Sequence, residues 1–450
     1  MASNDQISKK HLLLNPDEAT FLELFRILGS SEIDDREFMK CLKVTETMLE
    51  RRGIIFLSTL GQTALRAASG PMSWIGSTVG WGLNLLSGNT NASEKESDKY
   101  LSTVGYLDPR MDLDSLIRPG DIRYFPALCA MASKIAYENK AFIKATVEDR
   151  WKMKLLGAYD FWNEYQEKHS TPSFMLHDKN ANPDMIVVAF RGTDPFDADA
   201  FSTDIDISWF KFGEGAGKVH SGFMKALGLQ KDETWPKIAK RDDNHPLAYY
   251  TIREELREIF RNNPWTKFIL TGHSLGGALA ILFSAVLVLH EESDILKRVE
   301  AVYTFGQPRV GNKKFGDFME GKFKDYGIRY FRFVYSHDII PRLPFDDNTL
   351  MFKHFGTCLY YDTNYEGQRV AEEPMQDYFS LQSFFTKKIY ALKELGRSFI
   401  IPFKHGPEYR ESWLLQLYRV FGVAALAGLV AHGPQEYINA TRLGNADILT

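Results

Sequence analysis

Short runs of Val, Ile, Phe and Tyr recur in the second half of the chain and predict β-strands. Their sequences are MIVVAF, KFILTG, VEAVYTFG, IRYFRFVY and CLYY, at residues 185–190, 267–272, 299–306, 328–335 and 358–361. Each run is bounded by Pro, Gly or Asn, as strands commonly are. Stretches with helical periodicity lie between them, notably 252–261 and 275–290. Strands that are apolar on both faces and alternate with helices predict an α/β fold with a mostly parallel sheet covered by helices.

The first hundred residues follow a different pattern. Phe21, Leu24, Phe25 and Leu28 recur at helical spacing with charges between them, so helices are predicted within 16–52. The chain then becomes almost uncharged from 53 to 93, a stretch rich in glycine that contains Trp74 and Trp81.

This uncharged stretch has three possible interpretations. A transmembrane helix needs about 20 mostly apolar residues in a row, but Arg66, Ser-Gly-Pro at 69–71 and many hydroxyls interrupt this one. A packed glycine-rich element is the plain alternative. We favour an interfacial anchor, or a shallow hairpin, with its tryptophans at the level of lipid headgroups. The predicted domains are therefore an N-terminal helical region, 1–100, with a lipid-anchoring stretch at 53–93, and an α/β domain, 101–450.

Composition and charge narrow the class of protein. With 44% hydrophobic and 25% charged residues, the 450-residue chain is globular, and a net charge of -4 argues against nucleic acid as a partner. Cys41, Cys129 and Cys358 are too widely spaced for a disulfide framework or a metal site, which favours a reducing compartment. The start, MASNDQISKKHLLLN, lacks the apolar stretch of a signal peptide. No metal or cofactor is expected.

The segment TGHSLGGALA, residues 271–280, lies where a predicted strand turns directly into a predicted helix. Such a turn forces its central residue into a strained conformation, and Gly272 and Gly276 remove the collisions that larger neighbours would cause. The hydroxyl of Ser274 would stand at a helix N-terminus, where backbone N–H groups favour developing negative charge. This is the pattern of a nucleophile elbow.

A serine nucleophile needs a histidine base and a carboxylate, which follow it along the chain in this architecture. Asp338 comes directly after the strand IRYFRFVY, in a loop that Pro341 and Pro344 constrain, and is the preferred carboxylate over Asp325, Asp346 and Asp347. Among later histidines, His354 precedes a strand and is expected to be structural. His405 and His432 both begin a His-Gly-Pro sequence, and the pattern alone does not separate them.

The first strand ends in Arg-Gly-Thr, and the loop after it should donate to the oxyanion. The N–H of Thr193, together with that of Leu275, is expected to hold the tetrahedral intermediate. Residues 194–210, in which apolar and acidic side chains alternate, are either a movable cover over the serine or a rigid surface loop.

Five motifs occur in order: FRGTD, VHSGF, GHSLGGALA, TFGQPRVGN and HDIIPRLP. Together they resemble the class 3 triacylglycerol lipases, the fungal-lipase-like branch of the α/β-hydrolases, over about residues 185–345. The resemblance implies an α/β-hydrolase fold, ester hydrolysis without a metal, and triad roles for Ser274 and Asp338. It also implies an oxyanion hole at Thr193 and Leu275, and structural roles for His220 and His273.

The flanking sequences FKHFGTCLYYD and AHGPQEYINATRLG resemble the plant oil-body lipases. That group shares the terminal histidine motif, so the resemblance selects His432 as the base. An added stretch of helical character, 377–397, separates it from Asp338 and keeps His405 as the alternative. The apolar run 413–431 is expected to be a core helix leading to His432, because it contains Gln416 and Arg419.

The predicted function is hydrolysis of triacylglycerol or other glycerides at a lipid-droplet surface facing the cytosol, or at the endoplasmic reticulum membrane. Two alternatives stay open: a phospholipase A1 or galactolipase acting on polar membrane lipids, and a non-catalytic scaffold of the droplet.

Overall fold

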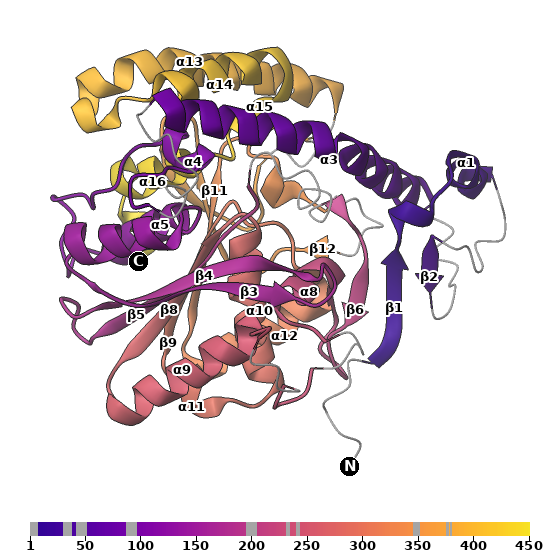
Figure 1. Ribbon diagram of the computed structural model, residues 1–450, viewed down its shortest axis with the longest axis horizontal. Coiled ribbons are helices and arrows are strands. Elements are labelled where there is room, and N and C mark those ends of the chain that lie inside the picture. Colours follow the sequence, from indigo (N-terminus) through magenta and orange to yellow (C-terminus); the bar gives the residue numbers. More distant parts are fainter. Residues whose placement is uncertain are drawn as a thin grey trace.

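The structure is a computed structural model that describes residues 8–29, 38–41, 52–86, 97–194, 205–230, 235–239, 244–344, 352–374, 378 and 380–450. Within these ranges the strands form two sheets (Figure 1). The large sheet has the strand order β14 (Gly367–Val370), β13 (Thr357–Tyr361), β11 (Arg329–Tyr335), β9 (Val299–Phe305), β8 (Lys267–His273), β5 (Met185–Phe190), β4 (Lys168–Asp178) and β3 (Lys154–Asn163).

The five predicted strands are confirmed, and they form the parallel centre of this sheet. β5, β8, β9, β11 and β13 pair with one another in parallel, whereas β14, β4 and β3 add antiparallel strands at the two sides. The antiparallel hairpin of β3 and β4 was not predicted. Parallel strands end at one edge of the sheet, so the loops that follow β5, β8 and β11 gather there.

Helices cover both faces of the sheet, which explains why its central parallel strands are largely apolar. On one face lie α8 (Ser221–Leu227), α9 (Ala248–Asn262), α10 (Leu275–Leu289) and α12 (Lys313–Tyr326), and on the other α5 (Tyr124–Ile135) and α16 (Pro434–Leu443). Alternate residues of β5 divide between the two cores: Ile186 and Val188 join the first, Met185 and Val187 the second. Three shorter helices in this part of the chain are α4 (Thr103–Leu107), α6 (Lys140–Lys144) and α11 (Ser293–Leu296).

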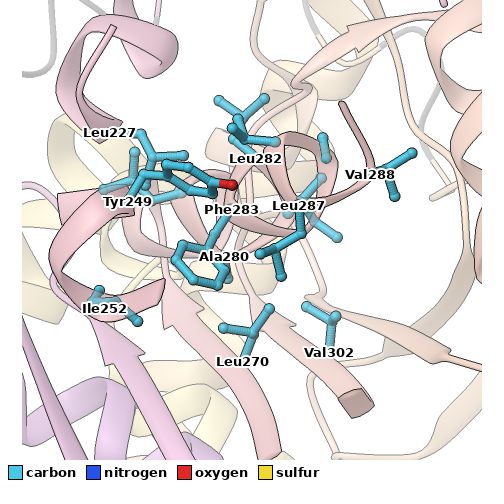
Figure 2. Close-up of a cluster of buried hydrophobic side chains, with 14 of the residues drawn as sticks. Leu227, Tyr249, Ile252, Leu270, Ala280, Leu282, Phe283, Leu287, Val288 and Val302 are labelled. Carbon is cyan, nitrogen blue, oxygen red and sulfur yellow. The ribbon is translucent and has the colours of Figure 1, made fainter. Parts of the chain in front are cut away.

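Helix α10 is the centre of the first core. Its residues from Gly276 to Val288 are all buried, because strands lie beneath it and other helices lie against it. Figure 2 shows Phe283 of α10 among Tyr249 of α9, Leu227 of α8 and Leu270 of β8. Burying a side chain of this size contributes about 1.5–3 kcal/mol. The helix that begins at the predicted nucleophile is therefore held firmly in place.

A second sheet joins the N-terminal region to the rest of the fold. Its strand order is β12 (Phe352–Lys353), β10 (Gly311–Asn312), β7 (Lys218–His220), β6 (Trp209–Lys211), β1 (Ser8–Leu14) and β2 (Met39–Cys41). The helix predicted around residues 21–28 is confirmed as α1 (Phe21–Gly29). Within 16–52, where helices were predicted, the chain also forms the short strand β2, because Phe38 and Met39 complete a small core with Leu12 and Trp209.

The uncharged stretch forms one continuous helix, α3 (Arg52–Leu86), rather than a hairpin. Its first half packs on the small sheet: Ile55 is buried there, and Gln62 donates to Asp206. Near its C-terminal end Asn84 donates to the carbonyl of Leu101, whereas Trp74 and Trp81 are exposed. Among the described residues, no helix is both long and apolar enough to cross a bilayer. Residues 87–93 of the predicted anchor lie outside the described ranges.

Three helices precede the C-terminal histidine. The predicted helical insertion is present as α13 (Leu381–His405), which is followed by α14 (Trp413–Phe421), a π-helical turn at Gly422–Leu426 and α15 (Ala427–Val430). The expectation that 413–431 is a core helix is only partly right. Leu415 and Arg419 point inward, but Trp413 and Leu417 are exposed, because α14 buries its charged side.

Candidate active site

Ser274 occupies the turn between β8 and α10 in a strained backbone conformation, with φ 57° and ψ -131°. Its backbone N–H donates to the carbonyl of Phe305 on the neighbouring strand, 2.8 Å away. A Cβ atom at Gly272 would lie 2.1 Å from the carbonyl carbon of Gly276, and one at Gly276 would lie 2.2 Å from the carbonyl oxygen of Phe190. Both glycines are therefore sterically required. Strain of this kind costs about 1–3 kcal/mol and is typical of functional sites.

Asp338 follows β11 at the same edge of the sheet and is completely buried. Its Oδ2 lies 2.8 Å from Nδ1 of His432 and also accepts a hydrogen bond from the Tyr437 hydroxyl. Its Oδ1 accepts the backbone N–H of Ile340 at 2.9 Å. Burial, followed by the nearby Asp338 charge, raises the pKa of Tyr437 well above its usual value, so that phenol remains a donor. Both carboxylate oxygens are thus fixed.

His432 lies between the end of α15 and the start of α16. Its carbonyl accepts from Nε2 of His273 at 2.7 Å, and the two rings lie 4.4 Å apart between centroids. Nδ1 of His273 then accepts the Tyr137 hydroxyl at 2.8 Å. Burial, and then the neighbouring His432, lower the pKa of His273 well below its usual value. His273 is therefore a neutral tether between the elbow and the C-terminal segment, the structural role that the resemblance implied.

Gly306 makes room for the Asp338–His432 pair. Its φ is 59°, and a Cβ atom there would lie 2.8 Å from Cε1 of His432 and 2.9 Å from Oδ2 of Asp338. The neighbouring Phe305 accepts the N–H of Ser274, so the imidazole lies directly beside the elbow. Sequence reasoning missed the roles of Gly306, Tyr437 and Tyr137. The only sequence signals were the TFGQP segment and the spacing of Tyr437 five residues after His432.

Three buried polar atoms of the site have no hydrogen-bond partner among the described residues: Oγ of Ser274, Nε2 of His432 and Oγ1 of Thr193. The Ser274–His432 hydrogen bond is thus not formed in this structure, and such catalytic bonds often tighten only when substrate binds. A Cβ atom at Gly192 would lie 3.0 Å from Cβ of Ser274, which places the loop after β5 against the elbow. Thr193 and Leu275 also line one cavity of about 190 Å³.

The other candidates lie elsewhere. His405 is exposed at the end of α13, with its ring against Tyr409. His354 is buried and bonded to the carbonyl of Pro341, and desolvation with the nearby Arg332 lowers its pKa to about 3. Asp325 is on the surface beside Lys322. Asp346 and Asp347 are outside the described residues.

Most of the proposed cover, 195–204, also lies outside the described residues. Its described end does not form a loose cover: Ile207, Trp209 and Phe210 are buried, and the last two belong to β6. His220, whose imidazole accepts the N–H of Gly222, caps the following helix α8. Within the described ranges, no group of three or more His, Cys, Asp or Glu side chains is placed to hold a metal ion.

Comparison with known proteins identifies clear relatives. The family described as Lipase (class 3) matches residues 187–348. The chain is 36% identical to the triacylglycerol lipase OBL1 of Arabidopsis thaliana, over 98% of this chain and 96% of that protein. It is 33% identical to the triacylglycerol lipase OBL1 of Ricinus communis, over 97% and 95%. A solved Rhizomucor miehei lipase–propeptide complex aligns with 56% of this chain and 70% of its own, at 23% identity and a TM-score of 0.40.

Proposed function

Because this chain belongs to the class 3 lipases and is similar to the plant triacylglycerol lipases along its length, we propose that it hydrolyses triacylglycerols with Ser274, His432 and Asp338 as its catalytic triad. One observation of the site carries the assignment of residues. A buried Asp338–His432 pair and a strained serine with an unpartnered hydroxyl meet at the carboxyl edge of a parallel sheet. This is the arrangement that acyl transfer by a serine nucleophile requires.

In the proposed mechanism, Oγ of Ser274 attacks the ester carbonyl while Nε2 of His432 accepts its proton. Asp338 holds the other ring nitrogen and stabilises the imidazolium. The N–H groups of Leu275 and Thr193 bind the oxyanion. Collapse of this intermediate breaks the ester C–O bond, and His432 returns the proton to the departing diacylglycerol oxygen. Water, deprotonated by His432, then attacks the acyl-enzyme and releases the fatty acid, which regenerates Ser274.

The triad assignment is tested by three single substitutions assayed on emulsified triolein. Ser274→Ala and His432→Ala should each lower kcat by at least about a thousandfold. His405→Ala, the matched control in the other His-Gly-Pro sequence, should keep near-normal activity. Circular dichroism and urea unfolding establish that each variant is folded. Normal turnover by a folded Ser274→Ala protein would contradict the assignment of the nucleophile. Normal activity of His432→Ala together with loss of activity in His405→Ala would contradict the assignment of the base.

The substrate class needs its own comparison. The same enzyme should release fatty acid faster from triolein emulsions than from phosphatidylcholine or galactolipid vesicles. A preference for the vesicles would favour the phospholipase A1 or galactolipase alternative. Labelling of Ser274 by a fluorophosphonate separates both enzymes from a non-catalytic scaffold, since only an activated serine reacts.

We also propose that the enzyme works at a lipid-droplet surface, with α3 as an interfacial element. The support is that Gln62 and Asn84 hold α3 to the protein by hydrogen bonds, whereas Trp74 and Trp81, which lie between these two residues, are exposed. Exposed tryptophans are favoured at the boundary between headgroups and acyl chains. The start of α3 also belongs to the small core. The paired substitution Trp74→Gln with Trp81→Gln is therefore a better test than deletion, and the flotation experiment below includes it.

A further inference from the structure

Helix α13 buries several polar and charged side chains and exposes most of its large apolar ones. The inward residues include Glu394 and Ser398, which are buried, and Arg397, whose side chain is mostly covered. The outward positions recur at helical spacing and carry large apolar side chains. These exposed residues are Phe384, Phe385, Ile389, Leu392, Phe399, Ile400 and Phe403, with Phe403 89% exposed. A water-facing helix normally shows the reverse arrangement.

Helix α14 is inverted in the same way and faces the same network. Arg419, only 1% exposed, bonds to Glu411 and Glu436 and lies 3.5 Å from Glu394 of α13. The opposite side of α14 exposes four apolar residues, Trp413, Leu417, Val420 and Phe421. Since the inward sides of both helices meet at one set of buried charges, their apolar sides point away from the body of the protein. We call these exposed side chains of α13 and α14 the apolar hairpin face.

The helices that bear this face lie at the carboxyl end of β11, beside Asp338 of the candidate active site. Glu394 of α13 accepts a hydrogen bond from Tyr335, the last residue of β11, and lies 3.6 Å from His337, next to Asp338. Figure 1 shows α13 and α14 along the top of the molecule, beyond the end of β11 and above α15 and α16. A flat surface that contacted the apolar hairpin face would therefore lie on the catalytic side of the protein.

The charged residues of α13 indicate which kind of surface the apolar hairpin face would bind. Its outward side carries Lys393 and Lys404, and Lys388 lies 5.3 Å from the ring of Phe384, whereas its single carboxylate, Glu394, is buried. Apolar side chains bordered by lysines, with no exposed carboxylate on the helix, are the pattern of an interfacial helix on anionic lipid.

We propose that the apolar hairpin face of α13 and α14 is a second lipid-docking surface, which binds the anionic phospholipid monolayer of a lipid droplet independently of α3. Its apolar side chains enter the acyl layer while its lysines stay among the headgroups. Docking in this way presents the catalytic edge of the sheet to the lipid. Binding through this face does not depend on the catalytic triad.

The test is flotation of the full-length protein with triolein droplets covered by phosphatidylcholine, with or without phosphatidylserine. All variants carry Ser274→Ala, so that hydrolysis does not alter the droplets and a wrong triad does not affect the result. The hairpin variant combines Phe385→Gln, Phe399→Gln and Phe403→Gln. Its matched control replaces three apolar residues outside the hairpin that are also largely exposed: Leu116→Gln, Ile238→Gln and Trp265→Gln. Both triples are also made with Trp74→Gln and Trp81→Gln.

The hairpin triple should lower the droplet partition coefficient at least tenfold in both backgrounds, because three large apolar side chains no longer enter the lipid. The control triple should stay within about twofold. Lys393→Gln with Lys404→Gln should remove much of the added binding due to phosphatidylserine. Equal binding of the hairpin triple and the unsubstituted chain, or an equal loss in the control triple, would overturn the proposal. The proposal would also be overturned if Trp74→Gln with Trp81→Gln, without the hairpin substitutions, abolished droplet binding.

Discussion

At the residue scale, the site depends on a position without a side chain. Gly306 has a positive φ and lies against both members of the Asp338–His432 pair. A Cβ atom added at this position would lie within 2.9 Å of each of them. Asp338 and His432 are both buried, so a displacement of either side chain would disturb the 2.8 Å hydrogen bond between them. Glycine is therefore required at this position by the packing of the site, whatever reaction the site performs.

Gly306→Ala should therefore lower kcat by about a hundredfold or more, since a shift of about 1 Å in a catalytic group has that effect. Stability should fall by about 1–3 kcal/mol from the left-handed backbone and the crowding. Initial rates on p-nitrophenyl butyrate and urea unfolding measure the two effects. Gly321→Ala is the control, because its Cβ would meet nothing within 4 Å. Normal activity of a folded Gly306→Ala enzyme would show that the pair tolerates displacement.

Sequence reasoning reached the residues of the site unevenly. The elbow around Ser274 could be predicted because strand, tight turn and helix are all local features. The pairing of His432 with Asp338 depends on a contact across 94 residues, and only the resemblance separated it from His405. Tyr437 and Tyr137 act through contacts between residues far apart in the sequence. No local sequence pattern therefore predicted their roles.

At the element scale, the inverted helices α13 and α14 owe their position to buried charges. Arg419 is the central cation: it bonds to Glu411 and Glu436 and lies near Glu394. Burial, then the Glu436 charge, raise the pKa of Glu394 above its usual value. Helical periodicity predicted α13 and α14, but the expectation that the apolar side of α14 faces the core was wrong. A pattern of apolar positions does not say whether protein, water or lipid lies against the apolar side of a helix.

Arg419→Met should cost about 3–5 kcal/mol of unfolding free energy, because it leaves Glu436 and Glu411 buried without this partner. The control is Arg410→Met at an exposed position nearby, which should change stability by no more than about 0.5 kcal/mol. Urea unfolding followed by circular dichroism measures both. If the two variants were equally stable, the buried charges would not be what holds the apolar hairpin face in place.

At the scale of the whole molecule, the parallel sheet was predictable and the second sheet was not. The central strands are apolar on both faces, which is a strong sequence signal. The strands of the small sheet are short, and β1 pairs with β6, nearly 200 residues away along the chain. Such long-range pairing leaves little trace in local sequence. It also ties the N-terminal region to the catalytic region through the small core of Leu12, Ile55 and Trp209.

Buried neutral histidines set the response of this assembled fold to acid. Burial, with Arg332 and Arg309 against Glu373, lowers the pKa of His354 to about 3; His337 has a similarly lowered pKa, about 3. In the unfolded chain a histidine titrates near 6.5. Between these two values the unfolded state holds the extra proton, so each such histidine lowers stability as pH falls, by about 1.4 kcal/mol per pH unit once the unfolded histidine is protonated.

His354→Gln should therefore lose less unfolding free energy than the unsubstituted protein between pH 5.5 and 4. The difference should be the contribution of one histidine, about 1.4 kcal/mol per pH unit. The measurement is urea unfolding of both proteins across pH 4 to 9. Glutamine retains a donor for the carbonyl of Pro341, 2.7 Å from the imidazole nitrogen, so the variant should lose little stability near neutrality. Above about pH 7.5 neither state protonates the histidine, and the two curves should run parallel. Parallel curves across the acid range as well would mean that His354 takes up its proton in the native fold.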